Sequence, residues 1–356
     1  MSYVEAGLQV RLLVVLVAAL ATGCSRAPER DHTQPSSEPY AFSKETVTMG
    51  SSLQVTVWTA DDPAATTAID TVFAEFDRLD HLMSVWKEGS DVLRLNAAAG
   101  REPVQVSPET LDVLTVARQV SEWTGGKFDV TFGALSGLWK FDQDQDDSIP
   151  PRSAVTARLS DVDYTALEID SARGTAFLRR PGMRAHLGGI GKGYAIDRGA
   201  AILRARGFND FMIQSGGDLY VSGRRGDRAW RLGIRDPRGP ADRSFAALDL
   251  TNRTFSTSGD YERFFIRDGQ RYHHILDPDL GEPARGCRSV TIVADKAVIA
   301  DGLSTGVFVL GPEKGMSLIE RLPDVEGVVV TSDNKVLVSS GLIGKLAMLA
   351  ALTDAP

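Results

Sequence analysis

The sequence predicts an α+β fold in which helices flank antiparallel sheets. Strand and helix patterns do not alternate regularly along the chain, and tight-turn signals are frequent. The clearest of these signals is Asp268-Gly269 between two extended segments, which is typical of a β-hairpin. Helix starts are marked by pairs such as Ser107-Pro108, because a hydroxyl cap followed by proline suits the first turn of a helix. Together these observations favour α+β over a doubly wound sheet.

The first 24 residues are predicted to be a lipoprotein signal peptide, outside the fold. Arg11 precedes an apolar run from Leu12 to Ala21, which is too short to span a membrane and suits a signal sequence. Cys24 follows small residues, which resembles a bacterial lipoprotein cleavage box. The resemblance implies that Cys24 is lipidated and tethers the protein to the periplasmic or extracytoplasmic face of a bacterial membrane. The alternative is an ordinary secretory signal with an incidental cysteine.

Composition separates the rest of the chain into a tether and a globular body. Residues 25–45 are rich in Pro, Ser, Glu and Arg and are predicted to be a flexible tether. Residues 46–345 are enough for one large domain or two intertwined domains. The net charge of −8 argues against a nucleic-acid partner. Cys287 is the only cysteine after Cys24, so no intrachain disulfide is expected.

The amino-terminal part of the body contains strand and helix patterns in sequence. Thr46–Thr59 alternates polar with apolar residues and is predicted to be a strand that contains Met49-Gly50. A helix is expected to begin at Asp62-Pro63, and a later helix to end at Gly125-Gly126. The run Lys127–Leu135 after those glycines is either a ligand-binding turn or a tight turn onto a strand.

A glycine-rich loop, His186–Asp197, follows a predicted strand and opens a helix. Glycines at such a turn let backbone N–H groups approach phosphate oxygens, and the helix dipole favours an anion. Lys192 adds a positive charge in the first helical turn. The pattern matches neither a P-loop nor a dinucleotide fingerprint. It indicates an anion site or, alternatively, a plain packing turn.

Two further runs supply side chains for chemistry. Asp301 and Thr305 are four residues apart, so a helix would place both oxygens on one face, where they suit Mg²⁺ or Ca²⁺ rather than zinc. The alternative is an ordinary solvated helix face. His273 and His274 precede Asp277-Pro278, and in a strand only one of the two imidazoles would face a given side.

Taken together, the motifs resemble those of the ApbE family of FAD:protein FMN transferases. The resemblance runs from Thr46 to Gly341 and includes the motifs already described, with three more: Met83-Ser84-Val85-Trp86, Ser215-Gly216-Gly217-Asp218 and Thr257-Ser258-Gly259-Asp260-Tyr261. It implies a duplicated T-fold-like arrangement with the active site between two lobes.

The family's chemistry implies roles for individual residues. Its members bind FAD and Mg²⁺, cleave the pyrophosphate, release AMP and attach FMN through a phosphoester to a Thr or Ser of an acceptor flavoprotein, such as a subunit of a quinone reductase. By position, the metal ligands would be Gly189, Asp301 and Thr305, and the base would be His274. The residues expected at FAD are Met49, Trp86, Lys127, Phe128, Asp129, Thr131, His186, Lys192 and Ile275. His186 stands where the family usually has Asp.

Two other functions fit the same motifs. One is a periplasmic lipoprotein that binds FAD without transferring FMN. The other is an FAD pyrophosphatase that yields FMN and AMP without an acceptor.

Overall fold

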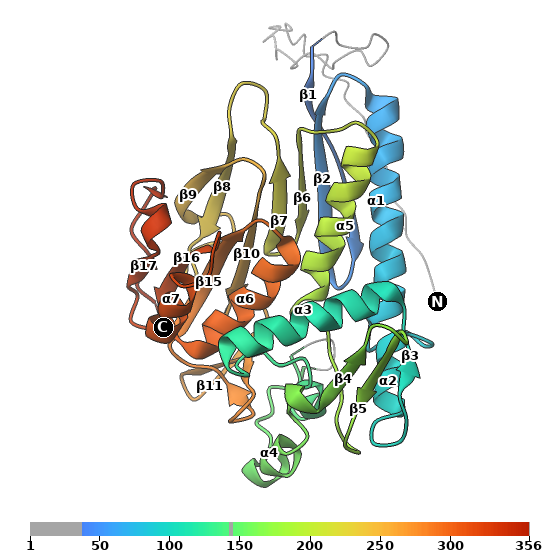
Figure 1. The fold of residues 1–356 in the computed structure, drawn as a ribbon. Coiled ribbons are helices and arrows are strands. Elements are labelled where there is room, and N and C mark those ends of the chain that lie inside the picture. The colour runs from blue at the N-terminus through green and yellow to red at the C-terminus, as the bar shows by residue number, and fades with distance from the viewer. Residues whose placement is uncertain (1–37, 142–144, 356) are drawn as a thin grey trace, which may run out of the picture. The chain divides into compact units, whose positions relative to one another are not determined.

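The computed structural model describes residues 38–355 except 142–144 (Figure 1). The described residues from Glu38 onward belong to one compact unit. The predicted signal peptide, Cys24 and most of the predicted tether lie outside the described residues. Among the described residues, no helix has the length and apolar character needed to cross a membrane.

An eight-stranded antiparallel sheet forms the centre of the unit. Its strands pair in the order β1-β2-β6-β7-β10-β15-β16-β17. They are β1 (Tyr40–Thr48), β2 (Ser51–Thr59), β6 (Phe211–Ser215), β7 (Asp218–Ser222), β10 (Arg253–Gly259), β15 (Cys287–Ala294), β16 (Glu326–Thr331) and β17 (Val336–Val338).

The sheet and its main helices repeat one arrangement twice. The first half runs β1-β2-α1-α5-β6-β7 and the second runs β10-β15-α6-α7-β16-β17, and the halves join where β7 pairs with β10. This topology agrees with the duplicated arrangement expected from the resemblance, and the α+β prediction is confirmed. The helices are α1 (Asp62–Met83), α5 (Gly191–Ala205), α6 (Ala297–Leu310) and α7 (Pro312–Ile319).

Both halves contain inserted helices and strands in addition to the repeated elements. Between α1 and α5 lie α2 (Asp91–Ala97), α3 (Pro108–Thr124), α4 (Arg152–Leu159), the 3₁₀ turns Gly133–Leu135 and Tyr164–Ala166, and a small sheet of β3 (Val104–Gln105), β5 (Thr175–Leu178) and β4 (Leu167–Asp170). Later insertions are β8 (Trp230–Arg235), β9 (Ser244–Leu250), the hairpin β11 (Phe264–Arg267) with β12 (Gln270–His273), and β13 (Leu276–Asp277) with β14 (Glu282–Pro283). The chain closes with the 3₁₀ turn Ser340–Leu342 and β18 (Ala347–Met348).

The central sheet is covered on both faces. Helices α1, α5, α6 and α7 lie over one face, as Figure 1 shows, and the larger apolar core fills the space between. A second core packs the other face against β8 and β9, and β9 also pairs with β18. Strand β15 is buried at every position because both of its faces are covered.

The structure corrects the predicted boundaries at both ends of the body. Residues 40–45, assigned to the tether, belong to strand β1. The single strand predicted over Thr46–Thr59 is instead a hairpin, because Met49 and Gly50 both adopt positive φ and turn the chain between β1 and β2. The body also continues past residue 345, where β18 pairs with β9.

Most local signals are confirmed. Ser107 caps α3 by accepting the N–H of Thr110 at 3.2 Å, and Gly125 ends that helix in the left-handed conformation with φ 61°. The turn at Asp268-Gly269 joins β11 to β12 as predicted. The cap of α1 is one residue earlier than expected, since Asp61 accepts the N–H of Ala64 at 3.0 Å.

Candidate active site

The close crossing of α5 and α6 brings the two halves together at one point. A Cβ atom on Gly193 would lie 2.3 Å from the carbonyl oxygen of Ala297, so only glycine permits this approach. Asp301 on α6 accepts the backbone N–H of Gly193 at 2.8 Å. Asp197 on α5 accepts the N–H groups of Ala297 and Val298 at 2.9 and 3.0 Å. A carboxylate of the first half therefore caps the first turn of the main helix in the second half.

Lys192 lies between two buried carboxylates at this crossing. Its ammonium donates to Asp218 at the start of β7 and lies 3.8 Å from Asp301 Oδ1. Desolvation disfavours the charged amine, but Asp218 and Asp301 more than offset it and raise the pKa of Lys192. Desolvation and the charge of Asp218 raise the pKa of Asp301, against the opposing effect of Lys192. Asp301 is thus a carboxylate that another cation would stabilise.

The residues expected to hold a metal lie close together. The Oγ of Ser258 on β10 is 3.1 Å from Thr305 Oγ1 and 2.8 Å from Ser304 Oγ. A Cβ atom on Gly189 would lie 3.7 Å from Thr305 Oγ1 and 3.4 Å from the Phe128 ring. The described residues contain no group of three or more His, Cys, Asp or Glu side chains able to hold a metal. A metal held by the three expected residues would bind the carboxylate of Asp301, the hydroxyl of Thr305 and the carbonyl of Gly189, and such oxygen ligands suit Mg²⁺ or Ca²⁺.

His274 is positioned as a neutral base with a defined tautomer. Its Nδ1 lies 3.3 Å from the carbonyl oxygen of Arg263, which can only accept, so Nδ1 carries the proton. This leaves Nε2 as the acceptor. Desolvation, with the positive charges of Arg263 and Lys192 among its neighbours, lowers the pKa of His274 to about 3. The imidazole is therefore neutral near pH 7.

The neighbouring His273 is buried, and its contacts indicate a role in the structure rather than in catalysis. It is 3 % exposed, its Nε2 donates to the carbonyl of Ala284 at 2.9 Å, and its ring meets Phe308 edge-on. Strand β12 ends at His273, and His274 follows it in a bend, where its ring contacts the carbonyl of Arg263 instead.

The turn after α3 is tied to the histidine motif. Lys127 donates to both carboxylate oxygens of Asp277, at 2.7 and 2.9 Å, and also pairs with Asp279 at 2.9 Å. Asp129 accepts the N–H and hydroxyl of Thr131 at 2.7 and 2.6 Å. These contacts give Lys127, Asp129 and Thr131 roles in shaping the turn that carries Phe128.

Three other residues expected at FAD lie in different surroundings: Met49 near the glycine-rich loop, Trp86 at the surface and Ile275 in the core. The methyl of Met49 lies 3.7 Å from where a Cβ of Gly191 would be, so Met49 reaches the glycine loop. Trp86 follows α1, and its side chain is 76 % exposed. The backbone N–H of Trp86 donates to Ser84 Oγ at 3.1 Å. Ile275 is buried in the larger core, so its side chain supports the site from within rather than at its surface.

The side chain of His186 accepts a hydrogen bond from the backbone of the glycine-rich loop, as a shorter side chain such as Asp could. Its Nδ1 accepts the N–H of Gly188 at 3.0 Å, two residues ahead, and its ring packs on Phe132 at 5.3 Å between centroids. This is the hydrogen bond of an Asx-type turn, which Asp forms with a carboxylate oxygen. The substitution therefore keeps an acceptor at this turn but replaces a carboxylate with an imidazole ring.

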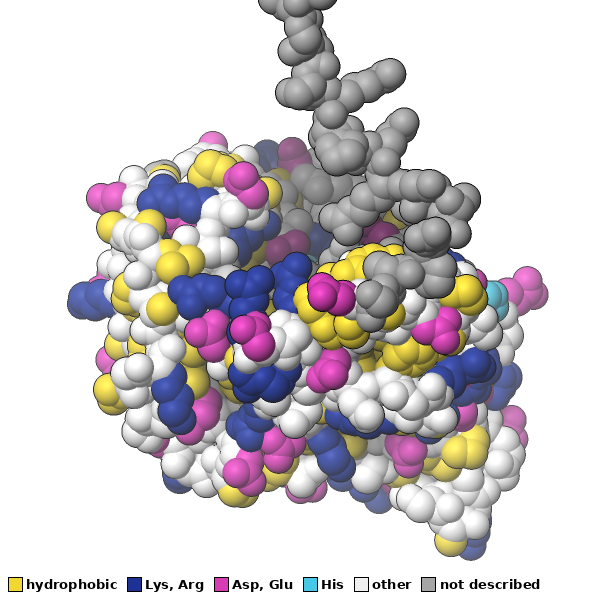
Figure 2. All heavy atoms as spheres, turned by 90° about the horizontal axis from the view of Figure 1, so that it is seen from above, with side chains coloured by type: hydrophobic (Ala, Val, Ile, Leu, Met, Phe, Trp, Pro, Cys, Tyr) yellow, Lys and Arg dark blue, Asp and Glu magenta, His cyan; other side chains and the backbone are white. Residues whose placement is uncertain are grey.

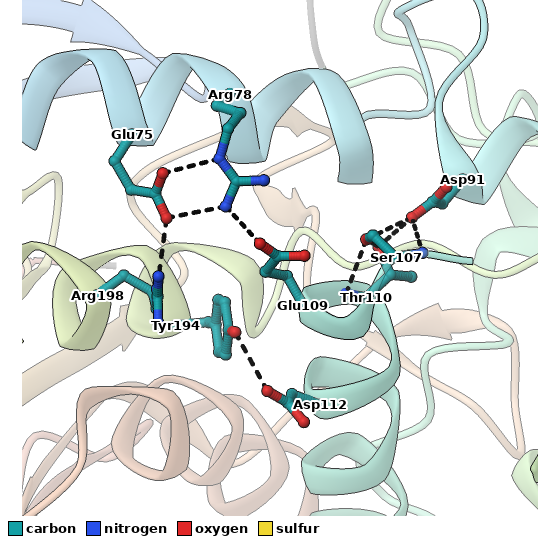
Figure 3. Close-up of polar contacts among 9 residues, drawn as sticks. All are labelled: Glu75, Arg78, Asp91, Ser107, Glu109, Thr110, Asp112, Tyr194 and Arg198. Atoms are coloured by element: carbon teal, nitrogen blue, oxygen red, sulfur yellow. Dashed lines mark hydrogen bonds and ion pairs between the residues drawn. The ribbon is translucent and has the colours of Figure 1, made fainter. Parts of the chain in front are cut away.

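A polar network connects α5 to neighbouring helices (Figure 3). Glu75 on α1 accepts from Arg78 and, at 3.3 Å, from Arg198 on α5. Arg78 also pairs with Glu109 on α3 at 2.5 Å. The contacts in Figure 3 further include Tyr194–Asp112 and the bonds of Asp91 to Ser107 and Thr110. The helix that carries Lys192 is thus fixed to two neighbouring helices.

Sequence reasoning missed three residues of this site. Asp218 is the main partner of Lys192, Ser258 bridges to Thr305, and Asp277 holds Lys127. All three lie within the motifs quoted above, but each partner is far away in the chain. The available signal was a buried-strand pattern that breaks at Gly216-Gly217 immediately before Asp218.

The fold and site define an enzyme built for an anionic substrate, with a neutral imidazole and a lysine that lies between two buried carboxylates. The profile of the ApbE family matches residues 49–329, and the chain belongs to this family.

Relatives agree over most of the chain. A Klebsiella pneumoniae protein named FAD:protein FMN transferase is 32 % identical over 316 residues, covering 87 % of this chain and 89 % of that protein. One of the same name from Treponema pallidum is 32 % identical over 327 residues, covering 87 % and 90 %. The crystal structure of the ApbE protein from Thermotoga maritima matches with a TM-score of 0.79 and 31 % identity, covering 86 % of this chain and 99 % of that one.

Proposed function

We propose that this enzyme transfers FMN from FAD to a Thr or Ser hydroxyl of an acceptor flavoprotein and releases AMP, in a Mg²⁺-dependent reaction. The proposal rests on Lys192 lying 3.8 Å from Asp301 where the two halves join, with Thr305 one turn further along α6. The charge of Lys192 is also among those that lower the pKa of His274. The names of the relatives support the flavin chemistry.

The metal in this proposal would be held by Asp301, Thr305 and the backbone oxygen of Gly189. Bound there, Mg²⁺ supplies charge neutralisation for the pyrophosphate of FAD. Lys192 adds a fixed positive charge, which Asp218 holds in place. The glycine loop at the start of α5 contributes the positive end of the helix dipole toward phosphate oxygens.

The chain's own residues move the proton. His274 Nε2 takes the proton of the acceptor hydroxyl, whose oxygen forms a bond to the phosphorus of the FMN moiety. The P–O bond to the AMP moiety breaks, and AMP leaves with the electron pair of that bond. A positioned base of this kind contributes about 10²–10⁴ in rate. The carbonyl of Arg263 keeps Nδ1 protonated, so the reactive nitrogen stays an acceptor.

The site belongs, in this proposal, to a lipid-anchored protein at the extracytoplasmic face of a bacterial membrane. The supporting observation is the signal-like run that ends at Cys24. Metabolic labelling with a radioactive fatty acid tests this directly. Label in the wild type that is absent from the Cys24→Ala variant is expected, and equal label in both would exclude lipidation at Cys24.

The transfer reaction has a direct test. Residues 38–356 are incubated with FAD, MgCl₂ and an acceptor domain from a quinone reductase, and a covalent FMN adduct is sought by mass spectrometry together with one equivalent of AMP. Free FMN and AMP without an adduct would instead indicate a pyrophosphatase. Bound FAD without AMP would indicate a binding protein.

Two variants separate the roles at the site. Asp301→Ala is expected to abolish Mg²⁺-dependent adduct formation, whereas His274→Ala keeps FAD binding and lowers turnover by about 10²–10⁴. The matched control is His81→Ala on the exposed face of α1. Unchanged turnover in Asp301→Ala would remove that carboxylate from the metal site.

A further inference from the structure

A turn bearing several arginines projects from the end of the sheet where β1 begins. Residues 223–229 connect β7 to β8, and Arg225 and Arg228 face each other across a two-residue turn, with the Arg225 N–H bonded to the Arg228 carbonyl at 2.8 Å. Gly226 occupies the turn with φ 68°. Arg224 and Arg231 flank the turn, and these four side chains are called here the arginine face.

The arginine face is solvent-exposed and only partly neutralised. All four arginines are exposed. Arg231 pairs with Asp249 at 3.2 Å, while no ion pair of Arg225 or Arg228 occurs among the described residues. The four arginines line one side of a surface hollow of about 820 Å³, in which Asp227 and Asp249 are the carboxylates. Positive charge therefore predominates here, although the whole chain carries −8.

This face lies beside the amino end of the described chain. A Cβ atom on Gly226 would lie 3.1 Å from the ring of Trp58 on β2, and Trp58 pairs with Ala41 at the start of β1. Ala41 and Ser43 themselves line the hollow. Figure 2 looks onto this end of the molecule and shows Lys and Arg side chains close together on it, with acidic side chains among them.

We propose that the arginine face is a docking surface for anionic phospholipid headgroups, which orients the domain on the membrane. Exposed guanidinium groups bind phosphate bidentately and are attracted to a negatively charged bilayer surface. Strand β1, the first described strand after Cys24, begins beside this face, since Ala41 and Ser43 line the same hollow. An acyl chain at Cys24 would hold this end of the domain toward the bilayer.

Docking through the arginine face would determine in which direction the active site faces relative to the bilayer. The arginine face lies on the β7–β8 turn beyond the carboxyl end of β7, whereas Asp218 lies at the first residue of β7 and Lys192 at the start of α5. Lipid contact at one end of the sheet would direct the other end, with the site, away from the bilayer and toward an acceptor. This inference concerns a different surface from the site and does not depend on flavin transfer.

The test measures lipid binding without the anchor. Residues 38–356 contain the whole described core, so this domain is mixed with vesicles of equal parts phosphatidylglycerol and phosphatidylcholine, and the co-sedimenting fraction is followed against lipid concentration. The double variant Arg225→Gln/Arg228→Gln is expected to lower the partition constant by about 25-fold, about fivefold for each arginine. Added salt should weaken wild-type binding.

Matched variants keep the result interpretable. Arg173→Gln/Arg179→Gln removes the same charge from exposed positions that flank β5 of the small inserted sheet and should bind like the wild type. Arg225→Lys/Arg228→Lys keeps the charge and should retain most binding. An unchanged thermal unfolding midpoint verifies that each variant is folded.

Several outcomes would overturn the proposal. They are no binding of the wild-type domain to the anionic vesicles, equal binding to pure phosphatidylcholine, and an equal loss in the Arg173 and Arg179 control. Displacement by free inorganic phosphate beyond that caused by chloride at the same ionic strength would point to a discrete phosphate site and would also overturn it.

Discussion

Asp301 accepts the backbone N–H of Gly193 at 2.8 Å, and this hydrogen bond crosses from one half of the duplicated fold to the other. The two residues can approach because Gly193 has no side chain, and its missing Cβ would lie 2.8 Å from Asp301 Cβ. The position of the Asp301 carboxylate, which is expected to bind metal, therefore depends on the packing of α5 against α6 as well as on α6 itself.

Gly193→Ala tests this dependence. The added methyl would lie 2.3 Å from a backbone carbonyl, which cannot rotate away, so α5 and α6 must separate. We expect a loss of about 1–3 kcal/mol in the free energy of unfolding by urea, together with loss of activity. Gly199→Ala on the same helix is the control, because its methyl would meet the ends of Ile213 and Val72 side chains at 3.0 Å, which can adjust. Equal effects would refute a special role for Gly193.

The Lys192–Asp218 pair is expected to be strongly coupled. Lys192→Met leaves the buried Asp218 without its main partner and should cost about 3–5 kcal/mol of stability. Asp218→Asn leaves Lys192, whose side chain is 23 % exposed and still lies 3.8 Å from Asp301, so it should cost less. The double variant should lose less than the sum of the two, because neither charge then remains unpaired. Urea unfolding of all four proteins gives the coupling energy. Simple additivity would show that the pair contributes no interaction of its own.

Acid should destabilise the protein through His273. Desolvation lowers the pKa of this histidine from 6.5 to about 4 in the folded state, so the unfolded state takes up the proton first as the pH falls. The stability from the neutral ring is present above pH 6.5 and is lost toward pH 4, by about 3 kcal/mol. His273→Gln should show a shallower decline over this range when unfolding is measured by urea at each pH. A slope identical to the wild type would contradict the assignment, and His81→Gln is the surface control.

His186 offers a test of what the turn at the glycine loop requires. His186→Asp replaces one acceptor for the Gly188 N–H with another, so it should keep or improve FAD affinity. His186→Ala removes the acceptor and should weaken FAD binding by about fivefold, since one neutral hydrogen bond contributes about 1 kcal/mol. Titration of flavin fluorescence measures both. Equal affinity of His186→Ala and the wild type would show that the hydrogen bond is not needed.

Sequence patterns formed by a few adjacent residues correctly predicted several helices and turns of the fold. Capping residues located α1 and α3 within a residue, and Asp-Gly located the β11–β12 hairpin. The spacing of Asp301 and Thr305 correctly placed both on one helix. These features follow from backbone hydrogen bonding and helix periodicity, which a few adjacent residues determine.

Features that depend on distant partners could not be predicted. Lys192 meets Asp218 only because β7 lies beside α5, and Lys127 meets Asp277 across 150 residues of sequence. The start of β1 was missed because an edge strand with alternating exposed residues is as polar as a linker. Met49 was placed inside a strand because its positive φ is unusual for a residue other than glycine.

The cap that Asp197 provides to α6 has a consequence for how the chain could be divided. A cut between β7 and β10 would leave the carboxyl-terminal piece with the first amides of its main helix unprotected, and the amino-terminal piece with a carboxylate that has lost its donors. Neither fragment would be a self-sufficient ancestor of this protein, although the two mixed together would be expected to reassemble.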